Sequence, residues 1–190
     1  MKIYILFPSL LSFASCGVLT PVKDAAVNHV LDPLVAERTL TGSRPAVAIS
    51  RPSLPGYLDR QQLVTRARGQ LMINPLEIWA EPLDLAISRV TASNLSRITR
   101  STNIQPVENF ITLEYTTLLE IRITRFEPDD SDQLTFEGTW KVQPVTGGEA
   151  SNHFFRITMA IPPGPSPITA RVDAMNLCLE RLARQIAAQL

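Results

Sequence analysis

Two histidines are the side chains in this 190-residue chain that are best suited to general-base catalysis. A nucleophile needs such a base, and a third group must hold the base in place. His29 lies in an expected strand near the N-terminus, and His153 lies at the expected start of another strand after a turn. We expect both at solvent-facing or edge positions, and we therefore predict no catalytic residue.

An acidic stretch, DDSD at residues 129–132, is the best candidate for a metal site. Asp130 and Asp132 are two residues apart, a spacing that is typical of calcium ligands. The stretch lacks, however, the glycine and the distal bidentate glutamate of an EF-hand loop. We interpret it as a solvated hairpin tip. Two cysteines are too few for a thiolate zinc site, and Gly147-Gly148 opens no helix that could bind phosphate. We predict no metal and no cofactor.

The first residues form a pattern that is typical of a secretory signal. Lys2 is followed by an apolar run at residues 3–13 and by the small residues Ala14 and Ser15. The run is shorter than the roughly 20 residues that a transmembrane helix needs. We predict a signal peptide at residues 1–15 rather than a transmembrane anchor.

Cys16 follows these small residues and precedes Gly17. The arrangement resembles the bacterial lipobox, in which the cysteine thiol receives a diacylglyceryl group and the new amino terminus is N-acylated. Such chains, at about 0.8 kcal/mol per buried methylene, would hold the protein on a membrane. Gly17, where an aspartate would retain the protein at the inner membrane, implies an outer-membrane lipoprotein facing the periplasm. The alternative is ordinary cleavage before Cys16, which leaves a plain N-terminal thiol.

The charge and length of the chain indicate which partners it excludes and how many domains it forms. The 18 basic and 18 acidic side chains balance and show no block of like charge. Because nucleic-acid binding needs a basic patch, we predict no nucleic-acid partner. After a lipidated tether at residues 16–25, residues 26–190 are sufficient for a single domain with its own core.

The first half of this domain predicts short strands near residues 27–31 and at residues 46–50. Two apolar runs on either side of Gly69 predict a hairpin over residues 61–73.

Helical spacing follows at residues 74–98, where Asn74 and Glu77 form a capping-box pattern around a proline. We expect an amphipathic helix that is restarted at Pro82, with Trp79 as a core anchor at its start.

The second half predicts three strands, at residues 112–126, 132–145 and 151–161. The first has a phase slip near its end, Gly138 is a candidate bulge position, and Trp140 belongs to the apolar side of its strand. These strands are expected to form an antiparallel meander.

The C-terminal segment predicts a long amphipathic helix. Ser166 can cap it, and apolar residues recur every three or four positions from Ile168 onward. Cys178 lies on the flank of this stripe, where we expect a buried, unreactive thiol. The fold class is therefore α+β, a mostly antiparallel sheet covered on one side by two long amphipathic helices.

Two local motifs connect these elements to a known family. The segment YLDRQQLVTR begins at Tyr57, WAEPL begins at Trp79, and F-x-G-x-W and the C-terminal helix follow. The combination resembles the ABC-type transport auxiliary lipoproteins, the PqiC-like proteins, over residues 26–190, although QQL stands here for the usual PQI. The matching positions are Tyr57, Leu58, Asp59, Arg60, Val64, Thr65, Arg66, Trp79, Ala80, Glu81 and Pro82.

The resemblance implies a role in lipid transport without catalysis. It implies a periplasm-facing outer-membrane lipoprotein that works with an inner-membrane system containing MCE-domain proteins, sometimes with an ABC transporter. In that role the folded body would be an adaptor that docks on a partner reaching across the periplasm. A homo-oligomer that matches a ring-shaped partner is a further hypothesis based on symmetry.

The motif residues divide into expected core and expected surface positions. We assign Leu58 and Val64 to the core, and we expect Asp59 to pair with Arg60 or Arg66 and so fix the shape of the loop. Tyr57 is the best candidate for an exposed contact with a partner, because tyrosine offers a large area with a polar tip. The alternative is that the whole motif specifies the fold, as we expect for Trp79, Glu81, Pro82 and Trp140.

Two other functions stay open at this point. A lipid-binding carrier would need an apolar cavity, and periodicity does not separate a cavity wall from a packed core. A periplasmic hydrolase would depend on His153 or on an acidic residue.

Overall fold

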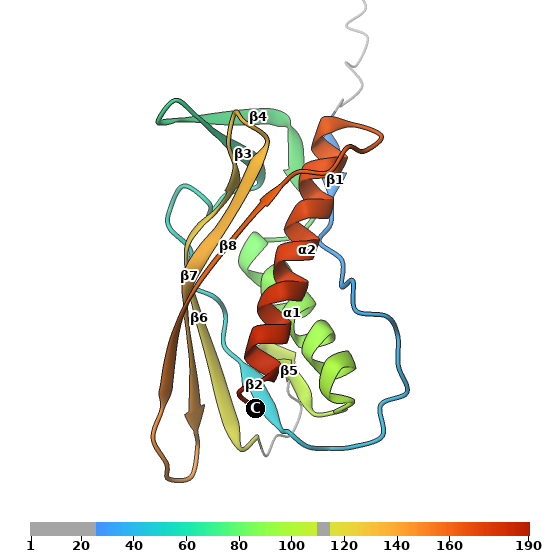
Figure 1. Ribbon diagram of the computed structural model, residues 1–190, viewed down its shortest axis with the longest axis vertical. Coiled ribbons are helices and arrows are strands. Elements are labelled where there is room, and N and C mark those ends of the chain that lie inside the picture. Colours follow the sequence, from blue (N-terminus) through green and yellow to red (C-terminus); the bar gives the residue numbers. More distant parts are fainter. Residues whose placement is uncertain (1–25, 110–114) are drawn as a thin grey trace, which may run out of the picture.

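The computed structural model describes residues 26–109 and 115–190, which form an α+β fold (Figure 1). The described strands are β1 (Val27–His29), β2 (Val47–Ile49), β3 (Gln62–Ala67), β4 (Gln70–Trp79), β5 (Ile104–Pro106), β6 (Thr117–Pro128), β7 (Gln133–Pro144) and β8 (Ser151–Ala160). The described helices are α1 (Leu83–Thr99), the short 3-10 helix η1 (Val107–Asn109) and α2 (Pro167–Ala187). The predicted signal peptide, Cys16, the tether at 16–25 and the first residues of the strand predicted at 112–126 lie outside the described residues.

The described strands form two mixed sheets. One has the order β5-β2-β6-β7-β8, in which β2 runs parallel to both neighbours and β6, β7 and β8 form the predicted antiparallel meander. The other has the order β1-β4-β3, with β1 parallel to β4 and an antiparallel β3–β4 hairpin. The α+β class is confirmed, but the prediction of a mostly antiparallel sheet is wrong. Apolar alternation reports a buried face, whereas the direction of a strand depends on a distant pairing partner.

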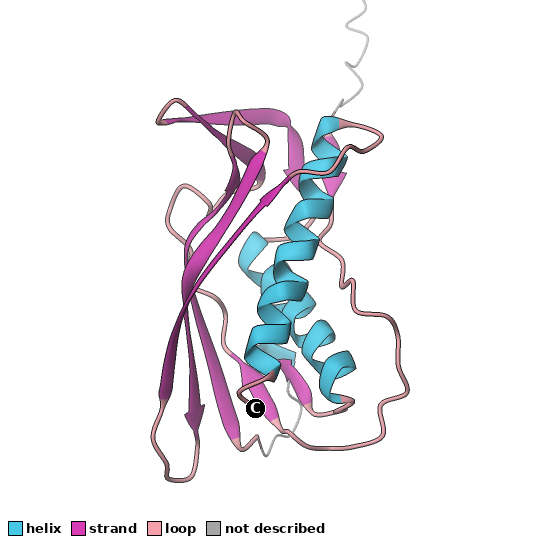
Figure 2. Cartoon of the chain, viewed as in Figure 1, coloured by secondary structure: helices cyan, strands magenta, loops and turns pink. Residues whose placement is uncertain are grey.

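Both helices lie on the same side of the five-stranded sheet, with α1 beside α2 (Figure 2). α2 begins as predicted, because the Ser166 Oγ accepts a hydrogen bond from the Thr169 N–H at 3.1 Å. Its apolar stripe is buried, and Cys178 is 0% exposed. Burial raises the pKa of the Cys178 thiol to about 12, so the thiol is protonated and unreactive at neutral pH.

The helix predicted from residue 74 begins nine residues later, at Leu83. Residues 74–79 instead complete β4, where Glu77 pairs with Val27 of β1 and Ile78 pairs with Gln62 of β3. Tertiary pairing outweighs local propensity here, because β1 pairs with Glu77–Trp79 and β3 pairs with Ile78. α1 therefore has 17 residues rather than the expected 25, and the expectation of two long helices holds better for the 21-residue α2.

Gly69 has the role that its position indicated, whereas the bulge predicted at Gly138 lies instead at Thr124 of the neighbouring strand β6. The turn between β3 and β4 places Arg68 and Gly69 at φ angles of 49° and 79°, the left-handed region that such hairpin turns require. Gly138 lies opposite a register shift between Ile123 and Arg125 of β6. A Cβ atom at Gly138 would lie 2.1 Å from the Arg122 carbonyl oxygen, so the two strands could not approach as they do.

Candidate functional site

The loop between β2 and β3, which holds the start of the YLDRQQLVTR motif, runs along β6. The Ser53 N–H donates to the Ile121 carbonyl at 3.0 Å, and the Ile123 N–H donates back to the Ser53 carbonyl at 2.9 Å. The chain then turns, with the Leu58 N–H donating to the Pro55 carbonyl at 2.9 Å. The segment just before the motif is therefore fixed to the five-stranded sheet by its backbone.

A buried carboxylate anchors this motif. Glu127, near the end of β6, is 0% exposed, and each of its oxygens accepts two hydrogen bonds. One oxygen accepts from Arg66 Nε at 2.7 Å and Arg125 Nε at 3.2 Å. The other accepts from the Tyr57 hydroxyl at 2.9 Å and the Phe126 N–H at 3.0 Å. These residues, the Glu127 cluster, satisfy a charge that would otherwise be costly to bury.

Tyr57 is half-buried, and its hydroxyl points into the Glu127 cluster rather than toward solvent. The Arg66 guanidinium lies 5.5 Å from the centre of its ring, within the range of a cation–π contact. Burial, followed by the hydrogen bond to Glu127, raises the pKa of Tyr57 to about 12. The polar tip that we expected to be free for a partner is therefore occupied within the fold.

The remaining motif residues follow the predictions in part. Leu58 and Val64 are in the core, at 2% and 8% exposure, as predicted. Asp59 makes neither of its predicted pairs, with Arg60 or with Arg66, among the described residues, and Arg66 pairs with Glu127 instead. Asp59 is exposed and Arg60 is half-buried.

Glu127 is the functional residue that sequence reasoning missed. It follows the phase slip in β6, where two successive residues, Phe126 and Glu127, are both buried. An acidic residue beside a buried phenylalanine normally points to solvent in a strand. The available signal was the slip itself, combined with Arg125, for which no partner was predicted.

The WAEPL motif joins β4 to α1. Trp79 is 6% exposed, so it is a core anchor as predicted, although at the end of a strand. Arg89 Nη2 donates to the Glu81 carboxylate at 2.5 Å and to the Leu31 carbonyl at 2.8 Å, and so connects α1 to the segment after β1. Pro82 is the N-cap of α1 and makes no side-chain cap.

The two histidines have structural contacts. His29 hydrogen-bonds with Glu77 across the β1–β4 pair. His153 stacks on Trp140, with ring centroids 3.9 Å apart, and Trp140 is 4% exposed. The acidic tip is a hairpin turn, as predicted, in which Asp129 accepts from the Ser131 and Gln133 N–H groups. Within residues 26–109 and 115–190, no group of three potential metal ligands comes together.

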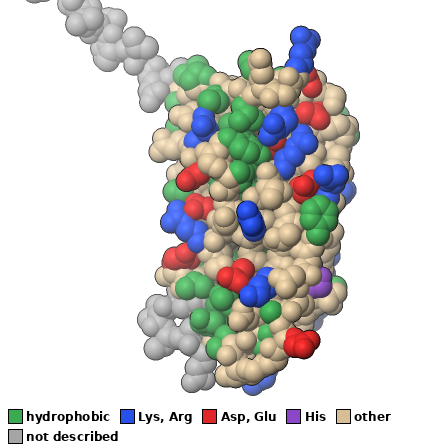
Figure 3. Space-filling view, turned by 90° about the vertical axis from the view of Figure 1, so that its left-hand side faces the viewer, with side chains coloured by type: hydrophobic (Ala, Val, Ile, Leu, Met, Phe, Trp, Pro, Cys, Tyr) green, Lys and Arg blue, Asp and Glu red, His purple; other side chains and the backbone are tan. Residues whose placement is uncertain are grey.

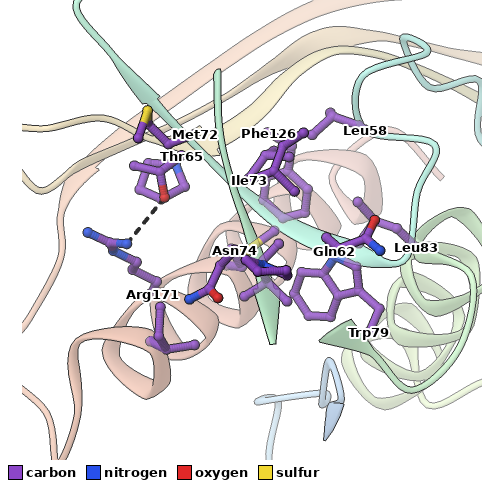
Figure 4. Close-up of a pocket in the computed structure, with 16 residues that line it drawn as sticks. Leu58, Gln62, Thr65, Met72, Ile73, Asn74, Trp79, Leu83, Phe126 and Arg171 are labelled. Atoms are coloured by element: carbon purple, nitrogen blue, oxygen red, sulfur yellow. Dashed lines mark hydrogen bonds between the residues drawn. The ribbon is translucent and has the colours of Figure 1, made fainter. Parts of the chain in front are cut away.

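A pocket of about 360 Å³ lies between the β3–β4 hairpin, the end of β6 and the first turns of α2 (Figure 4). We call it the hairpin pocket. Its wall is mainly apolar and includes Val64, Trp79, Leu83, Phe126, Ile168 and Met175. Four polar side chains also line it, namely Gln62, Thr65, Asn74 and Arg171. The sequence did not predict this pocket, because its wall residues have the same periodicity as the core.

Exposed apolar side chains continue from the pocket along β4. Met72, Ile73 and Leu76 are 56%, 48% and 49% exposed, and Met72 and Ile73 also line the pocket. Figure 3 shows the face of the molecule that lies on the left in Figure 1. Hydrophobic side chains gather in its upper half, with Lys and Arg side chains beside them, and a second group lies near its lower end. An apolar pocket with an apolar rim is a typical binding site for an apolar ligand.

A family model described as the ABC-type transport auxiliary lipoprotein component matches residues 29–187. The chain belongs to this family. The match confirms the family that the two motifs indicated, and it covers every described element except β1, of which it includes only the last residue. The ABC-type transport auxiliary lipoproteins are transport components rather than an enzyme family.

Two crystal structures share the fold of this auxiliary lipoprotein. An uncharacterized protein is 16% identical, with a TM-score of 0.66 over 80% of this chain and 95% of that chain. Protein XCC0632 from Xanthomonas campestris is 15% identical, with a TM-score of 0.68 over 85% of this chain and 93% of that chain. No curated protein matches. Neither α1 nor α2, the long helices of the described chain, has the length and apolar character needed to span a membrane.

Proposed function

We propose that this auxiliary lipoprotein is an outer-membrane adaptor of an MCE/ABC-type intermembrane lipid transport system. The family match over residues 29–187 carries the proposal. Cys16 would hold the diacylglyceryl and N-acyl groups, and the folded body would dock on an MCE-domain protein that spans the periplasm. The adaptor performs no catalysis.

The anchor sets where the body lies. Residues 16–25 would extend at most about 35 Å, so the body would stay close to the outer membrane. A partner that crosses the periplasm would therefore meet the body beside the membrane, where lipid must be delivered or collected.

The loop after β2 is the best candidate for the docking surface. Asp59 is exposed on a turn that the Glu127 cluster holds in place, and Arg60, whose Nε is buried, lies next to it in the chain. A loop that is rigid before binding loses little conformational entropy on docking. Tyr57 and Arg66 connect this turn to Glu127 through their hydrogen bonds. They would contribute to docking by holding Asp59 and Arg60 in place.

In-cell photocrosslinking tests the adaptor function. A photoreactive residue at Asp59 is compared with one at Glu149, an exposed acidic residue in the turn between β7 and β8. We expect Asp59 to capture an MCE-domain protein and Glu149 to capture none. Equal capture from both positions, or no capture of such a protein from Asp59, would contradict the proposed docking surface.

A second candidate function, lipid binding by the domain itself, is favoured by a specific observation. The hairpin pocket is an apolar cavity of a size that small ligands occupy. Lipid binding would make the protein a carrier as well as an adaptor. The hydrolase hypothesis has no such support, because both histidines make structural contacts.

A further inference from the structure

The hairpin pocket has a charged group at one end and a mainly apolar wall at the other. Figure 4 shows Arg171 of α2 on one side and, on the opposite side, Trp79 and Leu83 with the Gln62 amide beside them. Phe126 and Ile73 lie between these ends. The distribution matches a ligand with a charged head and a hydrocarbon tail.

Arg171 is incompletely paired. Its Nη1 donates to the Thr65 hydroxyl at 3.2 Å, and its Nη2 lies 3.6 Å from the carboxylate of Asp132. Asp132 is 71% exposed, so this ion pair is weak. The Nε atom of Arg171 is buried and has no hydrogen-bond partner among the residues that the structure describes. Buried donors are normally satisfied, and an anion at this end of the pocket would satisfy Nε.

The wall of the pocket suits a hydrocarbon chain better than a peptide. A peptide would bring backbone N–H and C=O groups that need partners. Among the side chains that line the pocket, only those of Gln62, Thr65, Asn74 and Arg171 are polar, so such partners are few. A hydrocarbon chain needs no hydrogen bonds. The volume of about 360 Å³ is small enough that only one chain, and not a whole two-chain lipid, would fit inside.

The position of the pocket also fits a membrane lipid. β1 begins at Val27 and lies directly beside β4, whose exposed Met72, Ile73 and Leu76 continue the apolar wall outward. Cys16, the proposed lipidation site, precedes β1 by about ten residues, a reach of about 35 Å. The described chain therefore begins at the end of the molecule that holds the pocket.

We propose that the hairpin pocket binds one acyl chain of an anionic glycerophospholipid, whose phosphate pairs with Arg171. The second acyl chain stays outside, against the exposed apolar residues of β4. This inference rests on the second candidate function above and specifies its ligand and its residues. The proposed docking residues Asp59 and Arg60 do not line this pocket.

Photolabelling of the full-length lipidated protein in vesicles tests this proposal. The vesicles contain phosphatidylethanolamine and phosphatidylglycerol, and a fraction of the phosphatidylglycerol has a diazirine near the end of one acyl chain. After illumination, mass spectrometry locates the label. We expect it on peptides that contain Ile168 and Met175, and not on the β8 peptide that contains Phe154, which is 65% exposed on another surface. Labelling of Phe154 to the same degree, or no label in the pocket, would overturn the proposal.

Two substitutions test the role of Arg171. We expect Arg171→Gln to reduce labelling of the pocket about tenfold, the effect of losing one strong charge-assisted contact, and Arg171→Lys to keep most of it. With a diazirine-bearing diacylglycerol, which lacks the phosphate, wild type and Arg171→Gln should label equally. If Arg171→Gln has no effect with phosphatidylglycerol, or if it also reduces labelling by diacylglycerol, the phosphate pairing is wrong.

The same variant separates this proposal from the adaptor function. Arg171→Gln should leave crosslinking from Asp59 to the MCE-domain protein unchanged. If crosslinking fails in wild type while the pocket is labelled, only the adaptor function fails. If crosslinking succeeds while the pocket of the wild type is unlabelled, only the lipid proposal fails.

Discussion

β3 contributes to both the Glu127 cluster and the hairpin pocket, which differ in how their polar groups are satisfied. In the cluster, Arg66 brings its charge to a fully buried carboxylate whose oxygens each accept two hydrogen bonds. In the pocket, Arg171 has a buried Nε without a partner in the described chain and an empty volume beside it. A saturated polar network specifies a shape, whereas an unsaturated donor beside an apolar cavity indicates a place for a ligand.

Removing Glu127 is the strongest test of this difference. Glu127→Ala leaves two guanidinium groups and the Tyr57 hydroxyl without their shared acceptor, and we expect it to lower the free energy of unfolding by about 3–5 kcal/mol. Urea denaturation measures this change. Glu149→Ala, at an exposed turn, is the control and should change stability by less than about 0.5 kcal/mol. A similar small effect for Glu127→Ala would show that the cluster does not hold the loop.

The two arginines provide a matched pair with a smaller effect. Arg66→Gln removes a charge-assisted bond to a buried acceptor, and we expect a loss of about 2 kcal/mol in the free energy of unfolding. Arg171→Gln removes one bond to a hydroxyl and one weak ion pair, and we expect a loss of less than about 0.5 kcal/mol. Denaturation of the two variants under the same conditions gives the comparison. Equal losses would mean that Arg171 has a structural role like that of Arg66.

The smallest expected effect on the free energy of unfolding comes from Tyr57, and it depends on pH. Its pKa is raised from 10.0 to about 12 in the folded protein, so the folded state holds this proton more tightly than the unfolded state. The stabilisation is therefore fully present below about pH 10 and is lost as the pH rises toward 12. We expect Tyr57→Phe to cost about 1 kcal/mol at pH 7, and this difference from wild type to shrink between pH 10 and 12. A difference that stays constant over that range would contradict the contact between Tyr57 and Glu127.

The local patterns of the sequence predicted the elements that depend on neighbouring residues. Ser166 and the apolar stripe after it predicted α2, because a helix bonds to itself and its cap is local. Gly69 predicted the β3–β4 turn, since a left-handed backbone favours glycine within a few residues of the chain. The motifs around Tyr57 and Trp79 indicated the family, which the match over residues 29–187 confirmed.

Tertiary structure decided what depends on distant partners. Residues 74–79 became the end of a strand because β1 pairs with Glu77–Trp79 and β3 pairs with Ile78, despite a helix-start pattern in the sequence. Glu127 could be buried only because Tyr57 and Arg66, which are 70 and 61 residues away in the chain, converge on it. The hairpin pocket likewise arises where β4 and α2 fail to fill the space between them. Periodicity determines which face of an element is apolar, but only packing decides whether that face meets another side chain or an open cavity.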